Sequence, residues 1–181
     1  MAKGEKKEIL YRVVKFEIHP DESQQPLLRR VSDNLLLVWN EALEERQKVF
    51  DQFVAPIYAQ LKEATERQDT LHVVDLRKEL TVAYKNHKVT LFDQINALTP
   101  RRKRDSAFAR VPRNWQEETL DALDSAYKSF LALRKNGDPQ ARPPRLRSAW
   151  HFCEIPGRFG FKLIGGKQIA LSCGDVSLTF P

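Results

Sequence analysis

The spacing of apolar residues changes twice along this chain of 181 residues, and the change limits the folds open to it. Residues 14–18 alternate apolar and polar side chains, which is the pattern of a half-buried strand. Over residues 21–147 apolar side chains recur every three or four positions, which is the helical pattern. Alternation returns over residues 148–181, with Gly165-Gly166 as a two-residue turn signal. The sequence therefore predicts a large helical region inserted between two strand-forming ends.

Prolines divide the first part of the helical region. A long helix is expected to about residue 53, and Pro56 marks a break or a new first turn, because proline lacks the amide hydrogen that a helix interior needs. Further helical segments follow, and Thr99-Pro100 is expected to end them. A basic loop is then predicted over residues 101–111.

The last helix has the clearest boundaries. Pro112 opens it, and Asn136-Gly137 is a sequence typical of helix C-termini. Residues 138–147 contain three prolines and predict an extended basic connector. The buried stripe of the helix is expected to consist of Leu120, Leu123, Tyr127, Phe130 and Leu131.

One strand near the start and about four near the end predict a small five-stranded β-barrel, closed or half-closed. The fold class is therefore expected to be α+β, with the helical domain inserted into the barrel. The domain boundaries that follow are residues 1–20 for the first part of the barrel, 21–147 for the helical domain and 148–181 for the second part.

Several classes of protein are disfavoured by the sequence. No stretch approaches the roughly 20 apolar residues of a membrane span, and no secretory signal is recognisable at the start. The chain holds two cysteines, Cys153 and Cys173, which are expected to be free thiols. No His/Cys cluster has metal-ligand spacing, and no glycine-rich phosphate loop or catalytic constellation is present. The expectation is a chain without catalytic residues, metal or cofactor, in the cytoplasm.

The positive charge is concentrated in one window. Residues 99–150 hold twelve Lys or Arg against six Asp or Glu, and this surplus of six equals the net charge of the whole chain. Nine of the twelve are arginines, which bind phosphate with two parallel hydrogen bonds. A localised surplus of this kind favours contact with a nucleic acid, whereas the alternative is a solvated basic loop.

Tryptophans offer a second, weaker signal, because bases stack on exposed aromatic rings. Trp39 lies beside the apolar stripe of the first helix and is expected in the core. Trp115 and Trp150 lie close to the basic residues, and for both the sequence leaves core packing and base stacking open.

Several short segments, in this order, carry a family resemblance. They are Arg12 to Pro20, Leu37 to Leu43 with its Trp39-Asn40 pair, Leu123 to Phe130, Pro143 to Arg147 followed by Trp150-His151-Phe152, and Val176 to Pro181. Together they resemble the N-terminal part of the transposon-encoded TnpB proteins, relatives of the compact type V CRISPR effector nucleases. The resemblance implies a split barrel, the wedge domain, with a helical recognition domain inserted into it.

The resemblance also implies partners and contact residues. In that family these parts hold a guide RNA and the start of its pairing with target DNA, and they read a short motif beside the target. RNA or phosphate binding would then fall to Arg101, Arg102, Lys103, Arg104, Arg142, Arg145 and Arg147, with Trp115 and Trp150 as stacking residues. Motif reading would fall to Arg113, Asn114, Glu117, His151 and Cys153, although some relatives carry Gln and Thr at such positions.

A full family member continues into a ribonuclease H-like (RuvC) nuclease domain and a zinc ribbon, which this sequence lacks. The expectation is a non-catalytic module that acts with a RuvC-containing nuclease subunit or a second copy, so that Mg²⁺ and Zn²⁺ belong only to the nuclease part. It would be a truncated form, a separate gene or a nuclease-less descendant. The alternatives are a structural or regulatory protein-interaction subunit and a stand-alone DNA-binding repressor.

Overall fold

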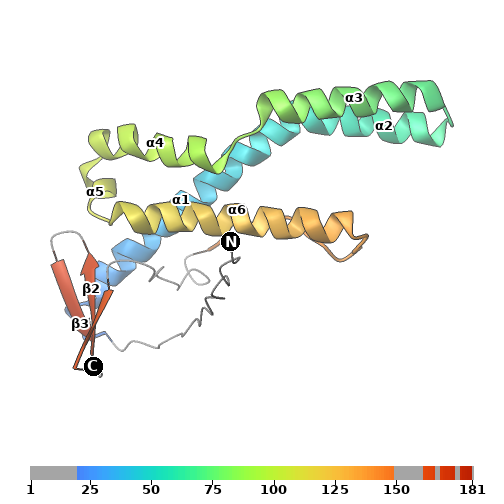
Figure 1. Ribbon diagram of the computed structural model, residues 1–181. Helices are drawn as coiled ribbons and strands as arrows, with labels where there is room; N and C mark the ends of the chain where they lie inside the picture. The colour runs from blue at the N-terminus through green and yellow to red at the C-terminus, as the bar shows by residue number, and fades with distance from the viewer. Residues whose placement is uncertain (1–19, 149–160, 166–167, 174–175, 181) are drawn as a thin grey trace, which may run out of the picture.

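A computed structural model describes residues 20–148, 161–165, 168–173 and 176–180 (Figure 1). Most of these residues are helical, and a small sheet follows the helices. The helical elements are α1 (Gln25–Val49), η1 (Phe50–Val54, a π-helix), α2 (Ala55–Glu66), α3 (Thr70–His87), α4 (Leu91–Arg104), α5 (Ser106–Ala109) and α6 (Arg113–Lys135). The strands are β1 (Phe161–Ile164), β2 (Gln168–Cys173) and β3 (Val176–Phe180).

The first helix does not break at Pro56. Helix α1 passes through η1 directly into α2, and the amide of Ala55 donates to the carbonyl oxygen of Phe50, five residues earlier. Proline has no amide hydrogen and its ring crowds the carbonyl four residues before it. A wider π turn just ahead of Pro56 relieves both effects, and Pro56 lies in the first turn of α2, so the predicted new first turn is confirmed although the helical run continues through it.

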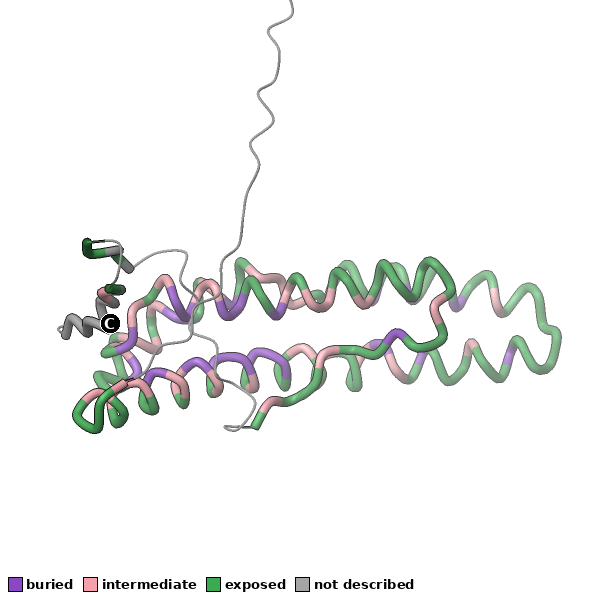
Figure 2. The backbone as a smooth tube through the Cα atoms, turned by 90° about the horizontal axis from the view of Figure 1, so that it is seen from below, coloured by how far each residue is buried: buried purple, intermediate pink, exposed green. Residues whose placement is uncertain are grey.

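Helices α2 and α3 form a hairpin that projects from the rest of the molecule (Figure 1). The side chain of Asp69 caps α3 by accepting a hydrogen bond from the His72 amide at 3.1 Å. Figure 2 shows buried positions along the facing sides of the helices and exposed positions over the far end of the hairpin. The core of the hairpin consists of Val54, Ile57, Ala64, Leu76, Leu80 and Ala83.

Helix α4 begins at a capping box, in which Thr90 and Asp93 each bond the other's backbone amide. It does not stop at Pro100 but continues to Arg104, and the short helix α5 follows. The predicted basic loop over residues 101–111 is therefore mainly helical. Four basic residues in the last turn favour this extension, because they face the negative end of the helix dipole.

Helix α6 confirms the predicted boundaries. Beyond it Gly137 has a φ of 82°, its amide bonds the Arg134 carbonyl, and the Asp138 amide bonds the Leu133 carbonyl, which is a Schellman ending. The predicted stripe is buried only in its first half, because α6 packs against α1 and α4 there and then runs past them. The core at this contact consists of Val38, Trp39, Ala42, Leu43, Leu98, Phe108, Leu120 and Leu123.

The five-stranded wedge-type barrel is wrong. The described strands form an antiparallel sheet in the order β1-β2-β3, with Phe161 opposite Leu171 and Ile169 opposite Phe180. Within the described residues β1 and β3 do not pair with each other, so the sheet is open, and the chain is predominantly helical rather than α+β. Alternating residues predict strands, but not the partners that would close a barrel. The predicted strand at residues 14–18 and residues 149–160 of the second alternating stretch lie outside the described residues.

None of the helices in the described part of the chain is long and apolar enough to cross a membrane.

Candidate nucleic-acid interface

The basic residues at the end of α4 have different surroundings, although they are neighbours in sequence. Arg102 is turned inward. Its guanidinium donates to the carbonyl oxygens of Val111 at 2.6 Å and Ala109 at 2.9 Å, and to Oε1 of Gln116 at 2.8 Å. Burial, followed by the charge of Arg113, lowers the pKa of Arg102 below its usual value. Arg102 therefore holds together the turn between α4 and α6.

The same turn is fastened to α1 by a buried amide. Gln116 is fully buried, and its Nε2 donates to Oδ1 of Asn34 at 2.8 Å and to the Phe108 carbonyl at 3.1 Å. Buried polar groups need such partners because leaving them unpaired is costly. Gln116 was not predicted from the sequence, although a glutamine four positions before Leu120, on the buried side of α6, is a signal for such a role.

Arg101 also has an intramolecular partner. Its guanidinium makes an ion pair with the carboxylate of Glu41 on α1, through both terminal nitrogens. It also lies 4.0 Å above the centre of the Phe108 ring, at cation–π distance. Arg101 is less available to a phosphate than its position in the basic run predicts.

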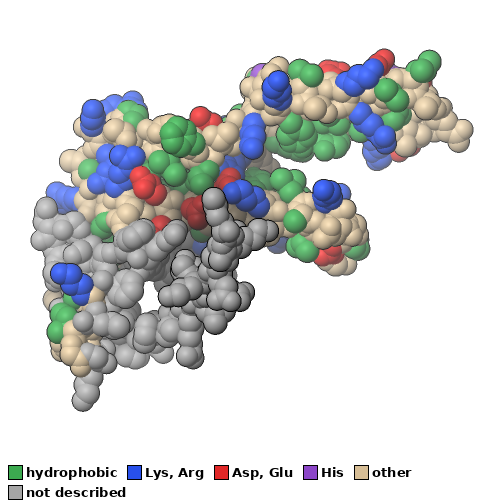
Figure 3. All heavy atoms as spheres, in the orientation of Figure 1, with side chains coloured by type: hydrophobic (Ala, Val, Ile, Leu, Met, Phe, Trp, Pro, Cys, Tyr) green, Lys and Arg blue, Asp and Glu red, His purple; other side chains and the backbone are tan. Residues whose placement is uncertain are grey.

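The remaining cations around this turn are exposed. Lys103 and Arg110 have exposed side chains and make no ion pair within the described part of the chain. Arg104 is exposed and donates from Nε to the Pro100 carbonyl at 3.3 Å. Figure 3 shows Lys and Arg side chains gathered over this end of the molecule. These are the residues of the basic run that offer charge to a phosphate backbone.

The connector after α6 is held against α1 by a tryptophan–asparagine pair. Nε1 of Trp39 donates to the Arg145 carbonyl at 3.1 Å. The Asn40 amide pairs with the backbone of Arg147 in both directions, at 2.9 Å each, as a strand partner would. The Arg147 guanidinium lies 3.6 Å above the Trp39 ring. We name these contacts of Trp39 and Asn40 the clamp. The clamp fixes the backbone of the connector, whereas the side chains of Arg142 and Arg145 are exposed.

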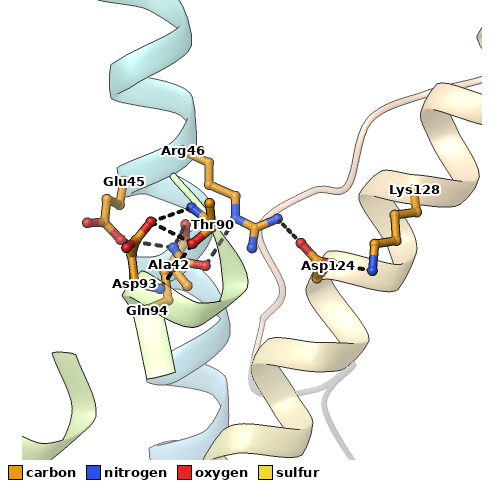
Figure 4. Close-up of polar contacts among 8 residues, drawn as sticks. All are labelled: Ala42, Glu45, Arg46, Thr90, Asp93, Gln94, Asp124 and Lys128. Carbon is orange, nitrogen blue, oxygen red and sulfur yellow. Dashed lines mark hydrogen bonds and ion pairs between the residues drawn. The ribbon is translucent and has the colours of Figure 1, made fainter. Parts of the chain in front are cut away.

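A network of polar contacts joins α1, α4 and α6 (Figure 4). Arg46 donates from Nε to Oε1 of Gln94 at 3.0 Å and pairs with Asp124 at 3.1 Å. Asp124 also accepts Lys128 at 2.9 Å. Burial raises the pKa of Asp124, but the bonds from Lys128 and Arg46 outweigh it, so this pKa lies below its usual value.

The described tryptophans are core residues. Trp39 is buried as predicted, and Trp115 is fully buried. A ring with no exposed surface cannot stack on a base, so the structure decides the open alternative for Trp115 in favour of packing. Trp150 lies outside the described residues.

The predicted motif-reading residues are partly described. Arg113 and Glu117 lie one turn apart on α6 and pair with each other at 2.6 Å, and both reach the surface. Asn114, the residue after Arg113, is half-buried. His151 and Cys153 lie outside the described residues, so the grouping of the five residues stays a prediction.

Among the described residues no three or more His, Cys, Asp or Glu side chains form a group that could hold a metal ion.

Part of the chain is similar to a known protein family. Residues 10–53, less than half of the chain, match the HTH_OrfB_IS605 family model, which is described as a helix-turn-helix domain. This ties the chain to the IS605 OrfB (TnpB) transposase family and suggests a DNA-binding role, because helix-turn-helix domains bind DNA. No curated protein and no solved structure matches.

The matched stretch has an unexpected shape for that description. Its described part, residues 20–53, contains a turn followed by one uninterrupted helical run, α1 and most of η1. Two helices joined by a short turn are not seen there. The matched stretch nevertheless contacts the basic window. Five residues of α1 hold the window in place, namely Asn34, Trp39, Asn40, Glu41 and Arg46.

Proposed function

Because residues 10–53 connect the chain to the IS605 OrfB proteins, we propose that it is a non-catalytic nucleic-acid-binding module of an RNA-guided, TnpB-like system. In this proposal it binds a guide RNA and the target DNA. We also propose that this chain has the roles that the wedge and recognition domains have in the TnpB and type V proteins. The nuclease chemistry, with its Mg²⁺ and Zn²⁺, would reside in a RuvC-containing partner.

The observation that carries the proposal is the way the basic window is presented. The window is attached to α1, the matched helix, at the turn before α6 and again at the connector. Lys103, Arg110 and Arg145 project from these two fixed places with exposed side chains. Cations held on an ordered backbone lose less freedom when they bind phosphates than cations on a loose loop.

The two groups of cations lie on different sides of α1. Trp39, which holds the connector, and Glu41, which holds α4, are two positions apart and therefore about 200° apart around the helix. A partner that touches both groups must wrap around the bundle. A long, folded RNA meets this requirement more readily than a short straight duplex.

The test is the salt dependence of binding, measured by fluorescence anisotropy with a structured RNA and a random DNA duplex. Wild-type protein should bind the RNA more tightly, with a steep slope of log K against log salt. The triple variant Lys103→Ala, Arg110→Ala and Arg145→Ala should reduce that slope by about two to three, since each lost phosphate contact removes 0.7–0.9.

A matched control removes three positive charges elsewhere. Lys62, Arg67 and Lys78 are exposed on the hairpin and pair with acidic neighbours one turn away. Their replacement by Ala should leave the slope nearly unchanged. Equal, weak binding of RNA and DNA by wild-type protein, or equal slopes for the two triple variants, would refute the proposal.

A second candidate is a stand-alone DNA-binding repressor, which the helix-turn-helix description of the match favours. It requires tight binding to a particular duplex without RNA. Selection of duplexes from a random library, with and without bound RNA, separates the two candidates. A protein-interaction subunit would bind neither nucleic acid.

A further inference from the structure

The base of the helical hairpin exposes three aromatic side chains in one cluster. Phe50, Tyr58 and Tyr84 are 40%, 44% and 43% exposed. The centres of the Phe50 and Tyr58 rings are 6.2 Å apart, and the hydroxyls of Tyr58 and Tyr84 are 3.5 Å apart. A contiguous group of exposed rings is unusual on a soluble surface and marks a contact site. We name Phe50, Tyr58 and Tyr84 the aromatic wall.

The π turn builds this wall. In an uninterrupted α-helix, residues eight positions apart lie about 80° apart around the axis. A π turn accommodates one extra residue, so Phe50, the first residue of η1, and Tyr58, in the first turn of α2, come to within about 20° of each other. The distortion caused by Pro56 therefore aligns two rings that a regular helix would separate. π turns are frequent at functional sites.

The aromatic wall begins where α1 contacts α6, and a basic side of α6 begins at the same contact. Arg46 pairs with Asp124 on α6, and Phe50 lies one turn beyond Arg46 on the same side of α1. On α6 the positions that continue the Asp124 side are Lys128, Leu131 and Lys135, all exposed. The hairpin and α6 diverge from this point, and Figure 3 shows an open notch between them.

The notch carries positive charge. Asp124 accepts both Arg46 and Lys128, so one carboxylate faces two cations. Lys135 adds a further cation, and no carboxylate of the described residues pairs with it. A second copy or an apolar peptide would favour two apolar walls. An aromatic wall facing cations instead suits a ligand with flat rings and a negatively charged backbone.

We propose that this notch binds a segment of single-stranded nucleic acid, with bases on the aromatic wall and phosphates toward Lys128 and Lys135. A duplex does not satisfy this geometry because its bases are already stacked and paired. Lys128 and Lys135 belong to the basic window in sequence, but the proposal goes beyond the proposed function, which uses only Lys103, Arg110 and Arg145 at the turn before α6 and at the connector. It gives the projecting hairpin a function of its own.

The first test uses the unsubstituted full chain. A twelve-nucleotide oligothymidine carrying 5-iododeoxyuridine is bound, irradiated and mapped by mass spectrometry. Crosslinks should concentrate on Phe50, Tyr58 and Tyr84. They should persist in the variant lacking Lys103, Arg110 and Arg145, which separates this proposal from the proposed function. Crosslinks only on the connector, or no binding of the oligonucleotide, would overturn the inference.

The second test separates stacking from other contributions. The double variant Tyr58→Ala and Tyr84→Ala should weaken oligothymidine binding roughly a hundredfold, since each of the two lost stacks is worth about one factor of ten. The double variant Tyr58→Phe and Tyr84→Phe keeps both rings and should bind oligothymidine nearly as tightly as wild type. Phe92→Ala removes another exposed ring, on α4, and should have no effect. Equal losses in the Ala and Phe variants, or in Phe92→Ala, contradict stacking. A dimer dissociated by the Ala variant would assign the notch to a second copy instead.

Discussion

Replacing Arg102 by Ala tests whether the basic run at the end of α4 serves binding or folding. Arg102 makes three hydrogen bonds that close the turn between α4 and α6. Hydrogen bonds from a charged donor contribute about 1.5–3 kcal/mol each, but water can replace part of this at the two carbonyls. Water cannot easily replace the hydrogen bond from Arg102 to Oε1 of Gln116, because Gln116 is fully buried. We expect a net loss of about 3 kcal/mol in the free energy of unfolding.

Differential scanning calorimetry and circular dichroism melts measure this loss. For a chain of this size 1 kcal/mol lowers Tm by about 2–4 °C, so Arg102→Ala should melt about 6–12 °C below wild type. Arg102→Lys keeps the charge but loses the planar fork, and it should recover less than half of the difference. Lys103→Ala is the matched control, because Lys103 is exposed, and its stability should change by less than about 0.5 kcal/mol.

The two variants Lys103→Ala and Arg102→Ala should have the opposite ranking in RNA binding. Lys103→Ala should lower the salt slope for RNA by about 0.7–0.9, whereas folded Arg102→Ala, measured well below its Tm, should keep the wild-type slope. If Arg102→Ala melts within 2 °C of wild type and lowers the slope by about the same 0.7–0.9, then Arg102 is a phosphate ligand and its role in the turn is refuted.

Three further predictions concern the anchors. Asn40→Ala removes both side-chain bonds to Arg147; it should cost about 1–2 kcal/mol and speed hydrogen exchange at the Arg147 amide, while an unchanged exchange rate would argue against the clamp. The pKa of Asp124 is lowered in the folded chain, so its stabilising effect is present above its ordinary pKa of about 3.9 and is lost as pH falls below it. Urea titrations should therefore show a smaller acid-induced loss of stability in Asp124→Asn than in wild type. Thr90→Ala removes the capping box of α4 and should cost about 1 kcal/mol in the same titration, and a neutral result would show that the cap does not stabilise the helix.

Local signals were reliable where the chain itself supplies the stop. The Pro112 start and the Asn136-Gly137 end of α6 were predicted because proline and glycine restrict the backbone wherever they occur. The alternation over residues 168–173 and 176–180 likewise predicted β2 and β3. Pro56 lies in the first turn of α2, as one of the two predicted alternatives had it, whereas Pro100 was misjudged because a helix can continue past a proline when its neighbours pack well on both sides.

The candidate site was predicted in location but not in detail. Within one run of four cations, Arg101 pairs with Glu41 and Arg102 turns inward, while Lys103 and Arg104 are exposed. Nothing in the run distinguishes these roles, because each depends on a partner from another helix. The aromatic wall was not predicted at all, since Phe50, Tyr58 and Tyr84 become neighbours only through the π turn and the fold of the hairpin.

The amino-acid sequence by itself determined the helical identity of most of the chain, the strand character of its last part and the concentration of positive charge over residues 99–150. These properties depend on residue spacing and composition, which are local. The tertiary structure decided which cations face solvent, which tryptophans are core, and that the described strands form an open sheet rather than a barrel. Those outcomes depend on contacts between residues as many as 107 positions apart, and spacing along the chain carries no record of such partners.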